Sequence, residues 1–110
     1  TAGTTAELDP YAAGVDTPTA HGLGATPHFV EHYIQCLTGE YGYSIGDRVV
    51  LDGRDTNGAN FGYSIATDAT NVTIIGAAGA RIDIDNKSTG AAATITNGSW
   101  KVVAVPYKLN

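Results

Sequence analysis

The residues best suited to metal chemistry lie in one short segment, residues 28–32, His-Phe-Val-Glu-His. Their pattern, H-x-x-E-H, matches a zinc-peptidase signature in which a helix presents both histidines on one face. The flanking residues are β-branched and aromatic, which favours a strand, and the third histidine, His21, lies in a glycine-flanked turn. We therefore expect His and Glu on a strand face and no zinc site.

Two further groups of carboxylates are candidates for chemistry. In residues 81–85 Asp83 and Asp85 alternate with isoleucines, and a strand rise separates i and i+2 residues by roughly 7 Å, a spacing that suits inverting glycoside hydrolysis. No second acid, cleft or aromatic platform accompanies them, so a solvated strand face is the preferred interpretation. The loop 52–60 offers Asp52, Asp55, Asn57 and Asn60 as hard oxygen ligands for Ca²⁺, but the spacing is not that of an EF-hand loop, and Asp, Asn and Gly are also what tight turns require, so we expect a turn and no calcium site.

The sequence contains no Ser/His/Asp set and no glycine-rich phosphate loop at useful spacing. We predict no catalytic residues, no bound cofactor, no metal ligands and no enzymatic activity. The single cysteine, Cys36, excludes an internal disulfide and is expected to pack as a small apolar side chain.

Composition limits the partners. The 110 residues carry a net charge of −5 with six Lys and Arg, so no basic stripe for nucleic acid or for an anionic membrane surface is expected. Only 15% of residues are charged and large apolar residues are sparse. Such a chain gains burial at subunit interfaces, and we predict a homo-oligomer, most simply a homotrimer.

Short β-branched runs separated by Gly, Asn and Asp fill the chain from Arg48 onward. They predict strands at 48–51, 61–66, 71–75, 81–85, 93–96 and 99–103. Asn97-Gly98 predicts a two-residue hairpin between the last two. The fold class expected is all-β: a single antiparallel β-sandwich or jelly-roll-like domain.

Residues 28–37 form the most apolar run and leave two alternatives open. A helix would begin with Thr26 as its cap and Pro27 at its first position. A strand agrees better with the β-branched and aromatic composition, and we predict a strand.

Residues 1–27 differ from the rest, because Pro10, Pro18 and several glycines oppose a long helix or a central strand. We expect an extended N-terminal arm (1–27) outside a sandwich body (28–110). The arm would become ordered against a neighbouring chain, with the body folding without residues 1–20.

Two stretches carry a resemblance: residues 21–30 together with 41–47, and residues 95–103. The first, HGLG-x-x-P followed by GYS-x-GD, resembles small structural proteins of tailed bacteriophages, of the tail-fibre and virion-surface type. Residues 95–103 are similar to their C-terminal hairpin. The resemblance covers roughly residues 20–105 and implies a β-rich oligomeric component of the virion without enzymatic residues.

These observations predict a non-enzymatic virion protein, either a capsid decoration (cement) protein or a short fibre. It would bind the major capsid protein or tail proteins by shape. The predicted interface residues are Tyr11, Val15, Leu23, Phe29, Tyr33, Leu37, Trp100 and Tyr107. The alternative is a receptor-binding tail-fibre module in which Tyr41, Tyr43, Tyr63 and the Asn/Asp loops recognise a host glycan. A glycan or peptidoglycan hydrolase ranks third.

Overall fold

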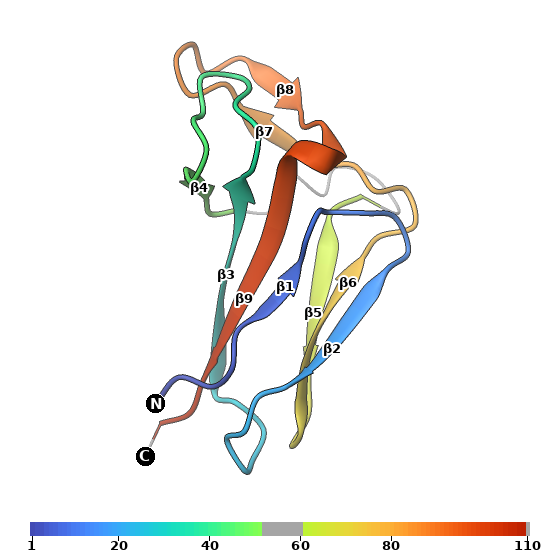
Figure 1. Cartoon of the computed structure of the whole chain (residues 1–110), viewed down its shortest axis with the longest axis vertical. Coiled ribbons are helices and arrows are strands. Elements are labelled where there is room, and N and C mark those ends of the chain that lie inside the picture. Colours follow the sequence, from blue (N-terminus) through green and yellow to red (C-terminus); the bar gives the residue numbers. More distant parts are fainter. Residues whose placement is uncertain (52–60, 110) are drawn as a thin grey trace.

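The computed structural model describes residues 1–51 and 61–109 and places them in an all-β sandwich, which confirms the predicted fold class (Figure 1). One sheet has the strand order β1-β9-β3-β4, the second the order β2-β6-β5, and β7 and β8 form a separate pair. All pairings are antiparallel. The strands are β1 (Ala6–Leu8), β2 (Asp16–Ala20), β3 (Phe29–Cys36), β4 (Arg48–Val49), β5 (Tyr63–Thr67), β6 (Asn71–Gly76), β7 (Asp83–Asp85), β8 (Ala92–Thr94) and β9 (Trp100–Tyr107).

The core lies between the two sheets, and alternation along the strands supplies it. In β6, Val72 and Ile74 are fully buried, whereas Ile75 on the opposite face is exposed. This is the period-2 pattern of a strand with one face on the core. The central strand β9 instead reads as a nearly continuous buried run that includes Trp100 and Val102. Cys36 is buried as predicted, and its burial raises the pKa of the thiol.

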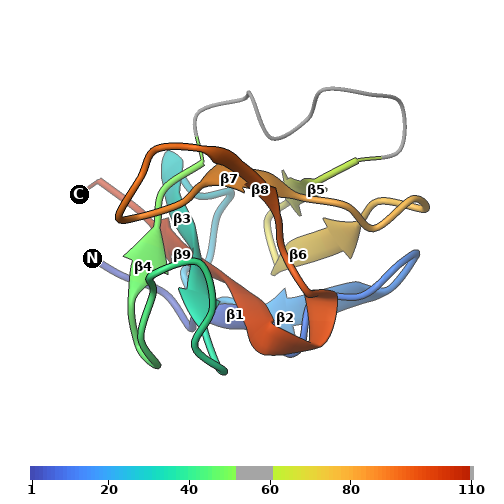
Figure 2. The same cartoon turned by 90° about the horizontal axis from the view of Figure 1, so that it is seen from above.

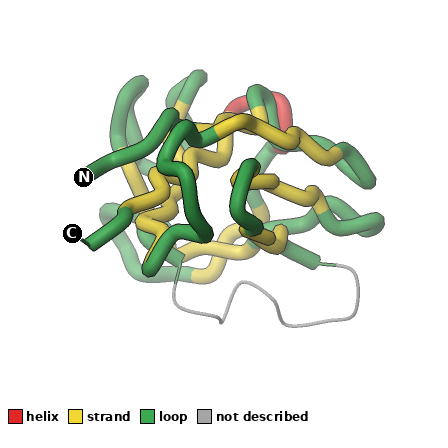
Figure 3. Tube along the Cα trace, turned by 90° about the horizontal axis from the view of Figure 1, so that it is seen from below, coloured by secondary structure: helices red, strands yellow, loops and turns green. Residues whose placement is uncertain are grey.

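The pair β7–β8 lies across one end of the sandwich and the termini lie at the other end (Figure 1), where the end-on views also place them side by side (Figures 2 and 3). The backbone groups of Thr1 and Lys108 bond to each other in both directions at 2.9 Å. In the β7–β8 pair Ile84 is buried, while Asp83 lies on the opposite, polar face, as the sequence predicts.

The strand prediction for residues 28–37 is confirmed, because β3 pairs with β9 along its whole length, from Phe29 opposite Tyr107 to Cys36 opposite Trp100. The predicted Asn97-Gly98 hairpin is wrong. A short 3₁₀ helix, η2 (Asn97–Ser99), stands there, and β8 pairs with β7 while β9 pairs with β3 and β1. The reason is tertiary: pairing with β3 buries Trp100 in the core.

The expectation that residues 1–27 lie outside the fold is also wrong. Strand β1 extends the first sheet by pairing with β9, and β2 extends the second by pairing with β6. Tyr11 is 1% exposed and its hydroxyl donates to the Gly62 carbonyl. Pro18 fits because β2 is an edge strand, where a missing N–H need not break the ladder.

Gly76 shows how closely the N-terminal segment packs. A Cβ at this position would collide with the backbone oxygen of Ala12, so no other residue fits without movement of the chain. The Gly14 amide donates to the Gly76 carbonyl, and the Gly76 amide donates to the Val15 carbonyl. Residues 1–27 are therefore part of the body.

His21 connects the N-terminal segment, residues 1–27, to the turn at Asp68 in the second sheet by hydrogen bonds. The side chain is 2% exposed, its Nδ1 accepts the Leu23 amide at 3.0 Å, and its Nε2 lies 2.9 Å from the Asp68 carbonyl oxygen. Because Nδ1 accepts, the ring proton belongs on Nε2, which donates. The histidine of the HGLG motif thus has a structural role.

Replacing Tyr11 tests the place of the N-terminal segment in the core. Tyr11→Ala is expected to lower the free energy of unfolding by about 3–5 kcal/mol, as truncation of a buried aromatic does. Tyr11→Phe, which removes only the hydroxyl, is expected to cost about 1 kcal/mol. Urea unfolding followed by circular dichroism measures both. A variant lacking residues 1–20 loses β1 and β2 and should not fold; a folded truncation would restore the arm interpretation.

The turn at Asp68 predicts a pH dependence. The Asn71 and Thr70 amides donate to the Asp68 carboxylate at 2.6 and 2.8 Å and lower its pKa. Because the folded pKa lies below the unfolded one, this contribution to stability is present above about pH 4 and is lost as the pH falls further.

The Asp68→Asn variant keeps an oxygen acceptor but cannot titrate, so its melting temperature should fall less than that of the wild type between about pH 4 and pH 2. Asp16→Asn, an exposed position on β2, is the control and should follow the wild-type curve. Thermal melts across this range measure the difference, and parallel curves for Asp68→Asn and the wild type would contradict the assignment.

Candidate interface at the β3 edge

In the part of the chain that the structure describes, one edge of β3 has no neighbouring strand over half of its length. The Leu37 amide donates to the Ser99 carbonyl at 2.7 Å, so odd-numbered residues of this strand direct their backbone groups toward β9. Even-numbered residues direct theirs the other way: the Cys36 amide donates to Asp47 and the Cys36 carbonyl accepts from Gly46. Strand β4 pairs with Ile34 and Gln35 alone. Among the described residues, no strand stands opposite Val30 and His32.

A groove of about 510 Å³ follows this edge. Side chains alternate between the two faces of a strand, yet the groove is lined by residues from both faces of β3. It must therefore run along the backbone edge itself. Its lining residues are Val30, Glu31, His32, Tyr33, Arg48 and Val50.

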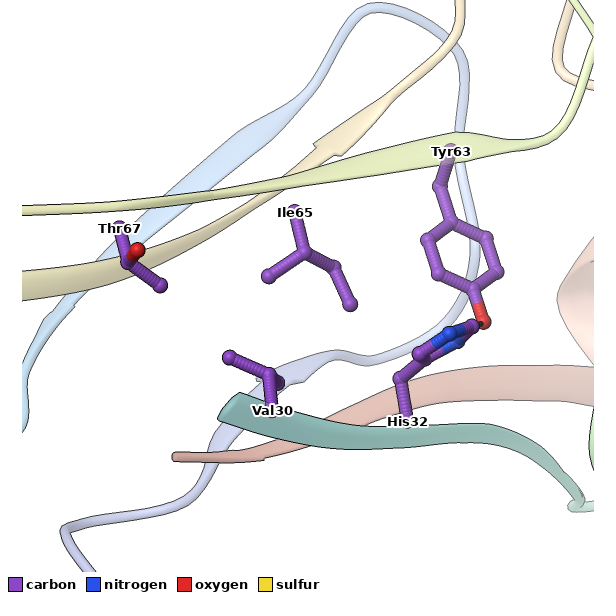
Figure 4. A pocket seen from close by; sticks show the side chains of 5 residues that line it. All are labelled: Val30, His32, Tyr63, Ile65 and Thr67. Carbon is purple, nitrogen blue, oxygen red and sulfur yellow. Dashed lines mark hydrogen bonds between the residues drawn. The ribbon is translucent and has the colours of Figure 1, made fainter. Parts of the chain in front are cut away.

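A second groove, of about 340 Å³, lies between the two sheets on the same side (Figure 4). Val30 and His32 point into it from β3, and Tyr63, Ile65 and Thr67 point into it from β5, which is the edge strand of the second sheet. His32 Nδ1 lies 2.7 Å from the Tyr63 hydroxyl, and the two rings meet edge to face. The groove thus has an apolar centre with a polar pair at one end.

Charge is distributed unequally on the outer face of β3. The Arg48 guanidinium lies 4.5 Å from the centre of the Tyr33 ring, a cation–π contact that covers this ring. Glu31 is exposed, and within the described residues its carboxylate forms no ion pair. The groove is therefore lined by one carboxylate that forms no ion pair in the described structure, Glu31, and by one guanidinium that lies over an aromatic ring, Arg48.

An exposed apolar patch adjoins the start of β3. Phe29 is 50% exposed and stacks on Tyr107 with ring centres 4.9 Å apart, and Leu109 beside them is 61% exposed. The Leu109 amide donates to His28 Nδ1 at 3.0 Å, which holds the C-terminal segment against this strand. We call Phe29, Tyr107 and Leu109 the terminal patch.

The predicted interface residues fall into two groups. Tyr11 and Trp100 are buried in the core and Tyr33 is 8% exposed beneath Arg48, so the expectation that these three fill an interface is corrected. Their burial depends on strands that are distant in the sequence, and the local sequence does not reveal it. The other five remain accessible in whole or in part: Val15, Leu23, Phe29, Leu37 and Tyr107. Of these, the structure brings Phe29 and Tyr107 together.

The hydroxyls of the tyrosines proposed for glycan recognition form hydrogen bonds with other residues of the chain. Tyr43 packs edge to face on Trp100 and its hydroxyl donates to the Asp85 carbonyl. The Tyr41 hydroxyl donates to the Thr94 carbonyl, and that of Tyr63 meets His32. Glu40, which the sequence did not single out, accepts from the Trp100 indole at 3.1 Å and from the Thr96 amide at 2.8 Å.

Of the two carboxylates considered for glycoside hydrolysis, that of Asp83 has structural contacts. Asp83 forms an ion pair with Arg81 at 3.0 Å and accepts the Thr94 hydroxyl at 2.7 Å, and the arginine lowers its pKa. The candidate calcium loop, 52–60, lies outside the described residues. In the part of the chain that is described, no three His, Cys, Asp or Glu side chains gather as metal ligands would.

Comparison with known proteins gives no match to any family model, curated protein or solved structure. Residues 1–51 and 61–109 contain no helix long and apolar enough to span a membrane.

Chelation tests the assignment of the histidines. His28 Nδ1 accepts the Leu109 amide, which places the ring proton on Nε2, and no three His, Cys, Asp or Glu side chains of the described residues gather around this histidine or around His32. We expect the melting temperature to be the same before and after EDTA treatment and after addition of Zn²⁺ or Ca²⁺. A fall of several degrees on chelation that either ion restores would establish a metal site.

Proposed function

We propose that the chain is a non-enzymatic structural component of a tailed-phage virion, a capsid decoration (cement) protein or short fibre. It attaches by shape to the capsid or tail lattice, as a homotrimer. The observation that carries the proposal is the terminal patch, in which the sandwich exposes a stacked Phe29–Tyr107 pair and Leu109 together. Aromatic side chains that keep an exposed face are typical of residues that anchor protein interfaces.

Two further observations support this proposal. The resemblance of residues 21–30 and 41–47 to small phage structural proteins falls on turns that the fold uses: Gly22, Gly24, Gly42 and Gly46 all have positive φ. These glycines set the geometry of the turns, because glycine adopts this backbone readily. The low content of charged residues is also compatible with a chain that assembles.

Copy number in purified particles of the phage that encodes the chain is the decisive measurement. Quantitative mass spectrometry with labelled peptides should find the chain in the particle, at hundreds of copies for a decoration protein and a handful for a fibre. Its absence from purified particles would overturn the proposal. Binding of the isolated chain on a glycan array, without presence in bulk on the particle surface, would favour the receptor-binding alternative.

Replacing Phe29 tests the terminal patch. Particles grown without the chain should take up the purified wild-type protein, and Phe29→Ser should reduce uptake about tenfold or more, as loss of an aromatic anchor does. Ile45→Ser is the control, because Ile45 is 75% exposed and lies outside the patch. Both variants should fold, as circular dichroism will show. Equal uptake of Phe29→Ser and the wild type would exclude the patch as the attachment site.

A further inference from the structure

We infer that β3 accepts an added antiparallel strand, supplied by an extended protein segment that has apolar side chains at alternate positions and a basic side chain between two of them. The inference concerns the open edge of β3 and not the terminal patch, and it stands whether or not the chain is a virion component. It goes beyond attachment by shape, because it specifies backbone pairing and the side-chain chemistry of the partner.

The backbone supplies the first argument. Val30 and His32 each present an N–H and a C=O on the side of β3 opposite β9, as the phase of the ladder requires. An antiparallel strand would form two-bond pairs with both residues, in line with β4, which ends at Val49. Strand addition to an exposed edge is an established mode of peptide recognition.

The inner face of the edge supplies the second argument. Partner residues opposite Val30 and His32 would direct their side chains to the same face as these two, toward β5. That face opens on the groove of about 340 Å³ whose centre is formed by Val30 and Ile65 (Figure 4). Apolar side chains of the partner would fill it and cover both residues, so the partner is expected to be apolar at these alternate positions.

The outer face of β3 indicates the charge of the partner segment. The partner residue between the two apolar positions would stand opposite Glu31 in a non-hydrogen-bonded pair, where side chains approach most closely. Glu31 is exposed and without an ion pair in the described structure, so a lysine or arginine is the complementary residue.

The same residue argues against a second copy of this chain as the occupant. The twofold register that uses residues 30 and 32 of both copies would place Glu31 directly opposite the same glutamate of the other copy. Like charges in that position destabilise the pairing. Shifting the register toward the start of the strand brings in His28, whose amide already donates to the Tyr107 carbonyl. A segment from a different source, with a basic centre, avoids both conflicts.

The test uses the isolated full chain and a capped nine-residue peptide with lysine at its centre, valine at the inward positions and threonine at the outward ones. Amide hydrogen exchange by NMR is the readout. When the chain is saturated with peptide, the exchange rates of the Val30 and His32 amides should fall by about tenfold or more. The Glu31 and Tyr33 amides, which already face β9, should keep their rates, and this alternation is specific to strand addition.

Two variant peptides and two protein variants are the controls. A peptide with glutamate at its centre should bind about fivefold more weakly, and a peptide N-methylated at the two central valines should not bind. Glu31→Lys should reverse the preference between the lysine and glutamate peptides. Asp16→Lys changes the net charge equally on an edge strand of the other sheet and should leave the order of preference unchanged.

Four results would overturn the inference. These are unchanged exchange at Val30 and His32 with millimolar peptide, equal binding of the N-methylated peptide, and equal affinity for the lysine and glutamate peptides. The fourth is protection of these two amides in the chain alone that disappears on dilution, because it would identify a second copy as the occupant. None of these results depends on whether the chain is found in virions.

Discussion

The pairing of β3 with β9 is the constraint on which the rest of the structure depends. All eight residues of each strand are paired, although the strands lie more than sixty positions apart in the sequence. One end of the ladder places Trp100 beside Cys36 in the core, and the other places Tyr107 beside Phe29 at the surface. Both the buried centre and the terminal patch follow from this single register. A shift of one residue would turn every side chain of one strand to the opposite face.

The same pairing explains why an edge remains open. The loop before β4 is held by contacts with the far end of the ladder, where Glu40 accepts from the Trp100 indole and the Tyr43 ring packs on it. Asp47 adds an ion pair with Lys87 at 2.8 Å. These contacts fix where β4 begins, and the strand ends after two residues, at Val49. The first half of β3 is thus left without a neighbour among the described residues on that side.

Sequence reasoning succeeded where the signal is local. Residues 28–37 and 71–75 are β-branched runs, and both are strands. It failed where pairing is distant: Ala6 pairs with Ala104, and no pattern within residues 1–27 reveals such a partner. Asn97-Gly98 has the composition of a hairpin, but burial of Trp100 in the core prevails over turn preference. The open edge was invisible because residues 48–51 all favour a strand, while the chain pairs only through Val49.

The edge strands of the two sheets differ in the features that oppose pairing with another chain. On β2, an edge strand, Pro18 removes a donor and Asp16 adds a charge, two features that oppose pairing with another chain. The open part of β3 has no proline and no lysine, and its one acidic side chain, Glu31, discourages a copy of itself more than a basic partner. Protection by charge alone is selective, since it excludes segments of one sign and leaves the backbone groups accessible to the other. An edge protected in this way is suited to recognition, whereas one that contains proline lacks a donor for an incoming strand of either charge.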